Sequence, residues 1–291
     1  MMHSMLRSGR NAYEDVETLP ELPEVEIIRR QLEKELAGAR IAACEVGLPR
    51  LVTYPTPLGY RRGLKGRRVE GVGRRGKYLL IGLDDGHELV IHLGMTGSLV
   101  LAEPAGERPR HTHIVFHLED GRDLLYVDPR TFGETALLRP GDRSPLRGLY
   151  AMGPEPLEKN FTCAVLEDSL RGKCRVKSAL LDQSRVAGIG NIYADESLHR
   201  AGIDPLRRLD GLTPDEIERI HRAVREVLSE AISRGGSSVS DYIDLRGERG
   251  SFQDSHRVYR REGERCPSCG GTIRREVISG RSSYFCPNCQ K

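Results

Sequence analysis

The sequence has no apolar run long enough to cross a membrane. A membrane-spanning helix needs about 20 apolar residues, and no such run occurs among the 291 residues. The first nineteen residues lack the apolar core of a secretory signal, and Glu14, Asp15 and Glu17 argue against a basic transit peptide. We therefore expect a soluble globular protein in which segment 1–19 is a disordered extension.

A large net charge is also lacking. The formal net charge is only +3, which is a weak indication of an anionic partner. Basic residues are concentrated locally, because segment 61–77 holds eight lysines or arginines and one acid, Glu70, for a local charge of +7. A polyphosphate partner suits such a segment, since each neutralised phosphate releases counterions. A solvated surface is the alternative interpretation.

The seven cysteines are odd in number, which argues against a framework of disulfides. Four of them form two Cys-x-x-Cys pairs, namely Cys266, Cys269, Cys286 and Cys289. Four thiolates at this spacing make a closed tetrahedral zinc site, with no position left open for catalysis. The spacing predicts one structural Zn²⁺ in a reducing cytoplasm. Cys44, Cys163 and Cys174 are interpreted as small apolar residues.

Short apolar runs broken by Gly, Pro and Asp predict an antiparallel β-sandwich in the first half of the chain. The expected strands are 78–83, 88–93, 98–101, 113–118, 124–127 and 134–138. Asp84-Asp85-Gly86 and Glu119-Asp120-Gly121 are turn signals between strands.

The apolar period becomes helical after a turn-rich connection, and this change suggests the domain plan. A capping box begins at Thr213, and a helix is expected from there to Gly235-Gly236. A β-hairpin formed by 272–278 and 282–285 is expected between the cysteine pairs. We predict an α+β multidomain fold. Its parts are a β-sandwich domain with a leading helix (20–150), a hinge (151–158), a helical domain (159–254) and a zinc finger (255–291).

The stretch Pro20-Glu21-Leu22-Pro23-Glu24-Val25-Glu26 precedes a helical apolar pattern. Pro23 suits the first turn of a helix, and Glu24 and Glu26 complement the positive end of the helix dipole. By itself, this is an ordinary helix start. The whole stretch, however, resembles the N-terminus of bacterial formamidopyrimidine-DNA glycosylases, which begin with a Pro-Glu-Leu-Pro-Glu-Val-Glu motif.

This resemblance implies that Pro20 is the nucleophile, acting through a free N-terminal amine. It makes Glu21 the acid that protonates the sugar, with Glu24 in a supporting role. A proline inside a chain is a tertiary amide and cannot attack. We therefore expect the functional chain to start at Leu19, in the place of the initiator methionine, with 1–18 added in error. The alternative is a real extension, either removed by a protease or retained in an inactive protein.

Further motifs follow in the family's order. Arg-Arg-Gly-Lys ending at Lys77 resembles the segment that carries a phosphate-binding catalytic lysine. His92–Ser98 and Asp128–Gly133 resemble the DNA-probing loops. In those loops, the resemblance makes Met95 and Phe132 wedges that fill the gap left by the flipped nucleotide.

The resemblance also assigns further DNA contacts. Arg130 meets the orphaned partner base, which in the family is preferably cytosine, and His111 contacts DNA. Thr131 stands where the family usually has a second arginine, which puts one backbone or strand contact in doubt. Without the resemblance, these loops could simply be turns with a core anchor.

Two phosphate contacts are implied in the second half of the chain. Gly188-Ile189-Gly190-Asn191 resembles the turn of a helix–two-turns–helix motif, in which glycines and a helix N-terminus approach a phosphate. Asn191 would bind the phosphate next to the lesion. Arg281, at the tip of the predicted hairpin, matches an arginine that grips the flanking phosphates. The stretch 235–253 resembles a mobile loop that caps the lesion.

The resemblance covers nearly the whole chain from Pro20 and predicts a bifunctional glycosylase and lyase that acts on oxidised purines in double-stranded DNA. The free proline amine attacks C1′, expels the base and forms an iminium, and elimination follows at both phosphates. We expect a monomer in the cytoplasm. Two alternatives are a non-catalytic binder of damaged DNA, if the extension is retained, and a protein-interaction module built on the zinc ribbon.

Overall fold

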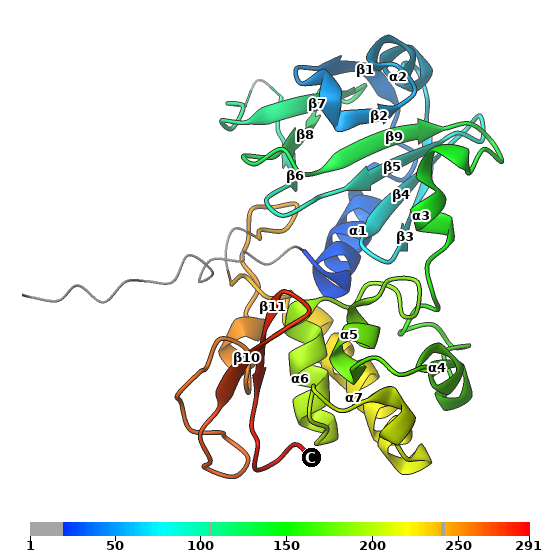
Figure 1. Ribbon diagram of the computed structural model, residues 1–291. Coiled ribbons are helices and arrows are strands. Elements are labelled where there is room, and N and C mark those ends of the chain that lie inside the picture. Colours follow the sequence, from blue (N-terminus) through cyan, green and yellow to red (C-terminus); the bar gives the residue numbers. More distant parts are fainter. Residues whose placement is uncertain (1–19, 105, 240–241) are drawn as a thin grey trace, which may run out of the picture.

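The computed structural model describes residues 20–104, 106–239 and 242–291. It has two lobes (Figure 1). One lobe contains the β-sheets, and the other contains most of the helices and a terminal β-hairpin. Helix α1 (Leu22–Leu36) lies between them and packs on both β3 and α7. No helix among the described residues is long and apolar enough to span a membrane.

The N-terminal lobe is a β-sandwich of two sheets. Strand order is β2-β9-β5-β4-β3 in one sheet and β1-β7-β8-β6 in the other. The strands are β1 (Ile41–Val46), β2 (Val52–Tyr54), β3 (Val69–Arg75), β4 (Tyr78–Leu83), β5 (Glu88–His92), β6 (Ser98–Ala102), β7 (Thr112–Leu118), β8 (Asp123–Val127) and β9 (Glu134–Leu138). All six expected strands are present, and β4 and β9 have the predicted bounds. The antiparallel expectation fails at one edge, because β2 pairs with β9 in parallel.

The basic segment 61–77 contains regular structure that its charge conceals. Helix α2 (Pro57–Leu64) buries Tyr60 and Leu64, and β3 buries Val69 and Val72. Tyr60 and Leu64 are at helical spacing, but two arginines separate them, and a register shift in β3 puts Val69 and Val72 three residues apart instead of two. The sequence analysis therefore interpreted this segment as one charged run, whereas the structure divides it between a helix and an edge strand.

The second lobe is helical. Its helices are α4 (Cys163–Ser169), α5 (Val176–Leu181), α6 (Asn191–Ala201) and α7 (Pro214–Ser233), whereas the short α3 (Arg147–Tyr150) packs on the first lobe through Leu149 (Figure 1). Helix α7 begins with the predicted capping box, in which Thr213 and Glu216 satisfy each other's backbone N–H. Gly235 and Gly236 follow its end with φ of +76° and +81°, so the expected glycine stop is confirmed.

The chain returns to the N-terminal lobe after α7. The side chains of Tyr242 and Leu245 belong to the core of the β-sandwich. The Gln31 side chain of α1 donates to Asp244 Oδ2 (2.6 Å) and accepts from the backbone N–H of Leu245 (3.0 Å). This segment lies in the stretch expected to cap the lesion, and it joins the two lobes.

The C-terminal hairpin consists of β10 (Arg274–Ile278) and β11 (Arg281–Phe285). A small core of Val258, Cys266, Ile273 and Cys286 supports it, and β11 packs on α6. Short 3₁₀ helices cover Pro49–Leu51, Ser144–Leu146, Leu209–Gly211 and Phe252–Ser255. The predicted α+β multidomain fold, with its sandwich, helical part and zinc-finger hairpin, is confirmed.

Candidate active site and zinc module

The site is organised by the carboxylate of Glu21. Residue Glu21 caps the start of α1, but its side chain reaches the N-terminus of α6. There it accepts hydrogen bonds from the backbone N–H of Gly190 (2.8 Å), Ile192 (3.1 Å) and Tyr193 (3.5 Å). Burial raises the pKa of this carboxyl, while the Lys77 charge and these three donors act in the opposite direction. An acid held in this way keeps its proton more readily than one in water.

The glycines of the turn before α6 make room for the start of α1 and the residue before it, Glu21. A Cβ at Gly190 would lie 2.2 Å from the Glu21 carboxyl carbon, and one at Gly188 would lie 2.7 Å from the Leu22 side chain. Gly188 also accepts the backbone N–H of Leu22 (3.1 Å). The sequence analysis expected these glycines and this helix end to face a DNA phosphate. Instead, the Glu21 carboxylate fills the helix N-terminus.

Glu24 lies one turn further along α1 and is almost completely buried. It accepts from the backbone N–H of Glu21 (2.8 Å), from the backbone N–H of Ser237 (2.8 Å) and from the Tyr193 hydroxyl. Burial raises its pKa to about 7, against the effect of the Tyr193 hydrogen bond. Glu24 thus links the start of α1 to α6 and to the segment after α7, which suits the supporting role expected of it.

Lys77 is buried directly before β4 and lies in the electrostatic field of Glu21, Glu24 and Arg281. Burial lowers the pKa of its ammonium group, the Glu21 charge raises it and the Arg281 charge lowers it further. Pro20, where the described chain begins, is buried directly before Glu21. The fold therefore brings Lys77 to Pro20 and Glu21, which lie far from it in sequence.

The arginines beside Lys77 do not serve as a free phosphate-binding run. Arg74 is paired with Glu155 (2.7 Å) and Glu26 (3.1 Å), and Arg75 donates to Met152 and Gly153 carbonyls. The backbone N–H of Gly76 also donates to Glu155. These contacts fix the β3–β4 turn, and with it Lys77, against the connection between the lobes.

The two expected DNA-probing loops lie side by side, and Asp128 joins them. This fully buried carboxylate accepts from Thr96 Oγ1 (2.6 Å) in one loop and from Gly133 N (2.9 Å) in the other. The backbone N–H of Arg130 donates to Thr96 Oγ1 (3.1 Å). Sequence analysis missed Asp128 and Thr96 as the junction. A buried acid between a strand and a Pro-Arg turn was the available signal.

The side chains at the tip of these loops face outward. Phe132 is 59% exposed, the highest fraction but one among the described large apolar side chains. The Arg130 guanidinium lies over its ring, 5.0 Å from the centroid. Met95 is half-buried, and His111 is exposed with φ of +67°. An exposed phenylalanine beside a guanidinium is unusual for a core anchor, the alternative interpretation of these loops.

Thr131 has a cationic neighbour. Its hydroxyl accepts a hydrogen bond from the Arg50 guanidinium, which comes from the 3₁₀ helix before β2. A cation therefore stands beside the position at which the family usually carries its second arginine. The sequence analysis did not single out Arg50, because it lies about eighty residues away in the chain.

A buried polar cluster fastens the hairpin to α5 and α6. Lys177 is fully buried, pairs with Asp195 (2.7 Å) and donates to Ser283 Oγ (2.7 Å). Lys177 and the Asn191 amide both donate to the Ser282 carbonyl, each at 3.0 Å. The hairpin residue before Ser282 is Arg281, which is exposed at the start of β11. These contacts position Arg281 near Lys77.

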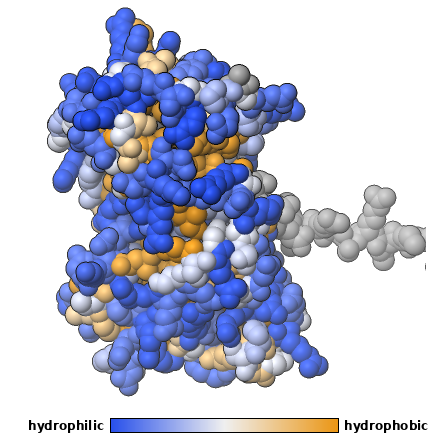
Figure 2. Space-filling model, turned by 180° about the vertical axis from the view of Figure 1, so that it is seen from behind, coloured by the Kyte–Doolittle hydropathy of each residue, from blue (hydrophilic) through white to orange (hydrophobic). Residues whose placement is uncertain are grey.

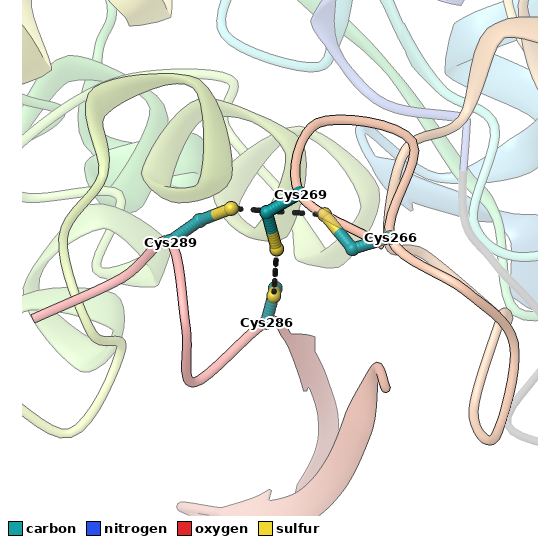
Figure 3. A group of neighbouring side chains, drawn as sticks. All are labelled: Cys266, Cys269, Cys286 and Cys289. Carbon is teal, nitrogen blue, oxygen red and sulfur yellow. Dashed lines mark hydrogen bonds between the residues drawn. The ribbon is translucent and has the colours of Figure 1, made fainter. Parts of the chain in front are cut away.

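The four predicted zinc ligands converge as the spacing required (Figure 3). The Cys266 and Cys289 sulfurs are 3.7 Å apart, and those of Cys269 and Cys286 are 3.5 Å apart. A tetrahedral ion with Zn–S bonds of about 2.3 Å has ligand sulfurs about 3.8 Å apart. The four thiolates therefore fit one structural Zn²⁺.

Figure 2, which shows the molecule from behind, has hydrophilic side chains over most of both lobes and apolar side chains around the narrower middle. The start of α1, with Glu21 and Glu24, lies at this level, because α1 joins the sheets to the helical lobe. The candidate site therefore stands at the junction of the lobes.

Three family models match successive parts of the chain. They are the formamidopyrimidine-DNA glycosylase N-terminal domain over 19–135, the H2TH domain of the same enzymes over 152–242, and a zinc finger found in FPG and IleRS over 263–291. The chain belongs to the formamidopyrimidine-DNA glycosylase family. Its activity is accordingly that of a DNA glycosylase with abasic-site lyase activity.

Individual relatives agree over almost their full length. A formamidopyrimidine-DNA glycosylase of Pelotomaculum thermopropionicum is 46% identical over 276 residues, covering 94% of this chain and 99% of the relative. One from Roseiflexus sp. is 45% identical, with 94% and 100% covered.

Solved structures agree as well. The Lactococcus lactis FPG (MutM) protein, in complex with a Fapy-dG containing DNA, superposes with a TM-score of 0.85 at 36% identity, covering 93% of this chain and 100% of that one. The MutM (FPG) protein of Thermus thermophilus gives 0.84 at 44% identity, with 93% and 98% covered.

Proposed function

We propose that this enzyme excises formamidopyrimidines and 8-oxoguanine from double-stranded DNA and then cleaves the abasic site through the N-terminal amine of Pro20. The observation that carries the proposal is the buried Glu21 carboxyl beside Pro20, held by the N-terminus of α6. Complexes of the Lactococcus lactis protein with Fapy-dG and abasic-site DNA support the substrate class.

The nucleophile requires that the chain start at Pro20, after removal of an initiator residue at position 19. The N-terminal family match begins at residue 19. The relatives align over 99–100% of their own length with 94% of this chain, which supports the expected start. An α-amino group titrates near 8, so about a tenth is neutral and reactive at pH 7. The amine forms a bond to C1′ as the base leaves, and loss of the amine proton gives a neutral aminal whose sugar ring must still open.

Glu21 supplies the proton that opens the sugar. A general acid must be protonated at working pH and within reach of the leaving oxygen. Burial favours the protonated carboxyl, and the α6 donors fix the side chain of the residue that directly follows Pro20. With the ring oxygen protonated, the C1′–O4′ bond breaks and the Pro20 nitrogen lone pair forms its second bond to C1′, which gives the iminium.

Lys77, Asn191 and Arg281 hold the phosphates on either side of the flipped nucleotide. Lys77 and Arg281 are close enough for the Arg281 charge to lower the Lys77 pKa, and two neighbouring positive charges favour the binding of an anion. A phosphate between them relieves this repulsion and sets the sugar over Pro20, an effect of positioning.

The exposed loop tip occupies the gap left by the flipped base. Phe132 and Met95 wedge into the stack, while Arg130 contacts the partner base, preferably cytosine, and His111 contacts the backbone. We assign to Arg50, which donates to Thr131, the strand contact that a second arginine makes in the family.

The zinc acts on structure alone, because four thiolates leave it no open position. It fixes the hairpin that carries Arg281. We place the enzyme in a reducing cytoplasm, since four metal-binding thiolates must stay reduced. We expect it to act as a monomer. A non-catalytic binder of damaged DNA is the second candidate, for a chain that retains residues 1–19.

The Glu21→Gln variant tests the proposal. A glutamine side chain keeps the size of the glutamate but cannot donate a carboxyl proton, so single-turnover excision of a formamidopyrimidine from a duplex should fall by about 10²–10⁴-fold. The matched control is Glu70→Gln, an exposed acid on β3, which should excise at the wild-type rate. Wild-type excision by Glu21→Gln would contradict the assigned role.

A further inference from the structure

Helix α6 presents one polar face to the zinc module. Asn191, Asp195 and His199 are spaced by four residues and so lie along one side of the helix. Asn191 donates to the Ser282 carbonyl (3.0 Å), and Asp195 accepts from the backbone N–H of Tyr284 (2.9 Å). The third residue, His199, points to the metal site itself.

His199 is 5% exposed, and its Nε2 lies 3.4 Å from the sulfur of Cys266, a zinc ligand. Its other ring nitrogen, Nδ1, is buried and has no hydrogen-bond partner among the described residues. A neutral imidazole carries one proton, on one nitrogen or the other. A proton on Nδ1 would leave a buried donor without an acceptor and would turn the Nε2 lone pair toward a thiolate. A proton on Nε2 avoids both.

We propose that His199 is a positioning residue of the zinc centre, whose Nε2–H donates a hydrogen bond to the Cys266 thiolate. Four thiolates around Zn²⁺ give the cluster a net charge of −2, and a donor to one sulfur spreads that charge. Hydrogen bonds from outside the ligand set orient metal ligands and raise metal affinity. In this chain, the donor lies on α6, which also contains Asn191 and whose N-terminus binds the Glu21 carboxylate.

The neighbouring residue Glu196 supports the same junction. Its carboxylate accepts from the backbone N–H of Arg257, Val258 and Tyr259, at 2.9–3.0 Å. These residues lead directly into the zinc module. Loss of the His199 hydrogen bond should therefore weaken zinc retention without detaching the module from α6, and the effect can be measured at the metal.

The test compares His199→Phe, which keeps a ring but removes the donor, with His199→Gln, which keeps a donor. Zinc transfer from the purified full chain to a chromophoric chelator should be about 10-fold faster for His199→Phe. For His199→Gln, the rate should lie much closer to that of the wild type. The matched control is His221→Phe, which removes a half-buried α7 histidine that bonds to the Phe161 carbonyl and should leave zinc transfer unchanged.

Two results overturn the proposal. The first is zinc transfer from His199→Phe at the wild-type rate. The second is equally accelerated zinc transfer from His199→Phe and His199→Gln, which would show that the loss of the ring's packing, and not of a hydrogen-bond donor, causes the effect. A measurement on the wild type covers the case in which a variant does not fold. In ¹¹³Cd-substituted protein, the His199 Nε2 proton should show scalar coupling to the metal through the sulfur. A His199 ring protonated on Nδ1, without such coupling, would contradict the assignment.

Discussion

At the scale of single residues, the site depends on acids kept out of water. Glu21 and Glu24 both lie at the start of α1. From the residues alone, the sequence analysis interpreted Glu24 as part of an ordinary helix start. That interpretation is correct as far as it goes, because both acids form the capping box of α1. It could not show that the Glu21 carboxyl also caps α6, because that contact joins residues about 170 positions apart.

The first residue-scale prediction concerns Gly190. Its backbone is extended, so alanine is permitted by the dihedral angles, but a Cβ would meet the Glu21 carboxyl at 2.2 Å. Gly190→Ala should destabilise the protein by about 1–3 kcal/mol through overpacking and should strongly slow excision. Urea unfolding and single-turnover assays measure both. Gly148→Ala in α3, where a Cβ meets nothing within 4 Å, should leave both unchanged or add slight stability.

The second concerns the pH dependence that Glu24 introduces. Its pKa is about 7 in the fold, above an ordinary 4.5, so the folded state favours the protonated acid. The resulting stability is fully present below pH 4.5 and is lost as pH rises to 7. The unfolding free energy of wild type relative to Glu24→Gln should fall by about 3 kcal/mol between pH 4.5 and 8. A difference that stays constant across this interval would contradict the buried, protonated state.

At the scale of elements, α6 connects the parts of the site. Its N-terminus holds Glu21, and its polar face holds the hairpin and approaches a zinc ligand. Sequence analysis expected the glycine turn that precedes α6, but assigned the helix end to a phosphate. The four-residue spacing of Asn191, Asp195 and His199 was visible in the sequence. Without the hairpin in place, nothing indicated what that stripe would bind.

The element-scale prediction concerns the buried pair between α5 and α6. Lys177→Met leaves the Asp195 carboxylate buried without its cation and should cost about 3–5 kcal/mol of unfolding free energy. In the double variant Lys177→Met/Asp195→Leu, most of this loss should be recovered, since no uncompensated charge remains. The exposed Lys173→Met serves as control and should change stability little. A double variant as unstable as Lys177→Met would show that packing, not charge, accounts for the loss.

At the scale of the whole molecule, the two lobes are held together at the site. Glu155 and its arginines fasten the connection between the lobes, and Tyr242 and Leu245 return to the sandwich core after α7. The sequence supported the fold class, the strands with clear alternation and the zinc ligands, because those signals are local. Arg74 and Arg75 looked like DNA contacts because their acidic partners lie far away in the chain.

The most direct test of the account is borohydride trapping on duplex DNA that contains 8-oxoguanine, with the 291-residue chain compared to a form that starts at Pro20. Borohydride reduces the iminium between a free amine and the sugar to a stable covalent bond. The account predicts a trapped complex for the Pro20 form alone, because Pro20 in the longer chain is an amide. Failure of the Pro20 form to trap, while it still binds the DNA, would contradict the assigned nucleophile.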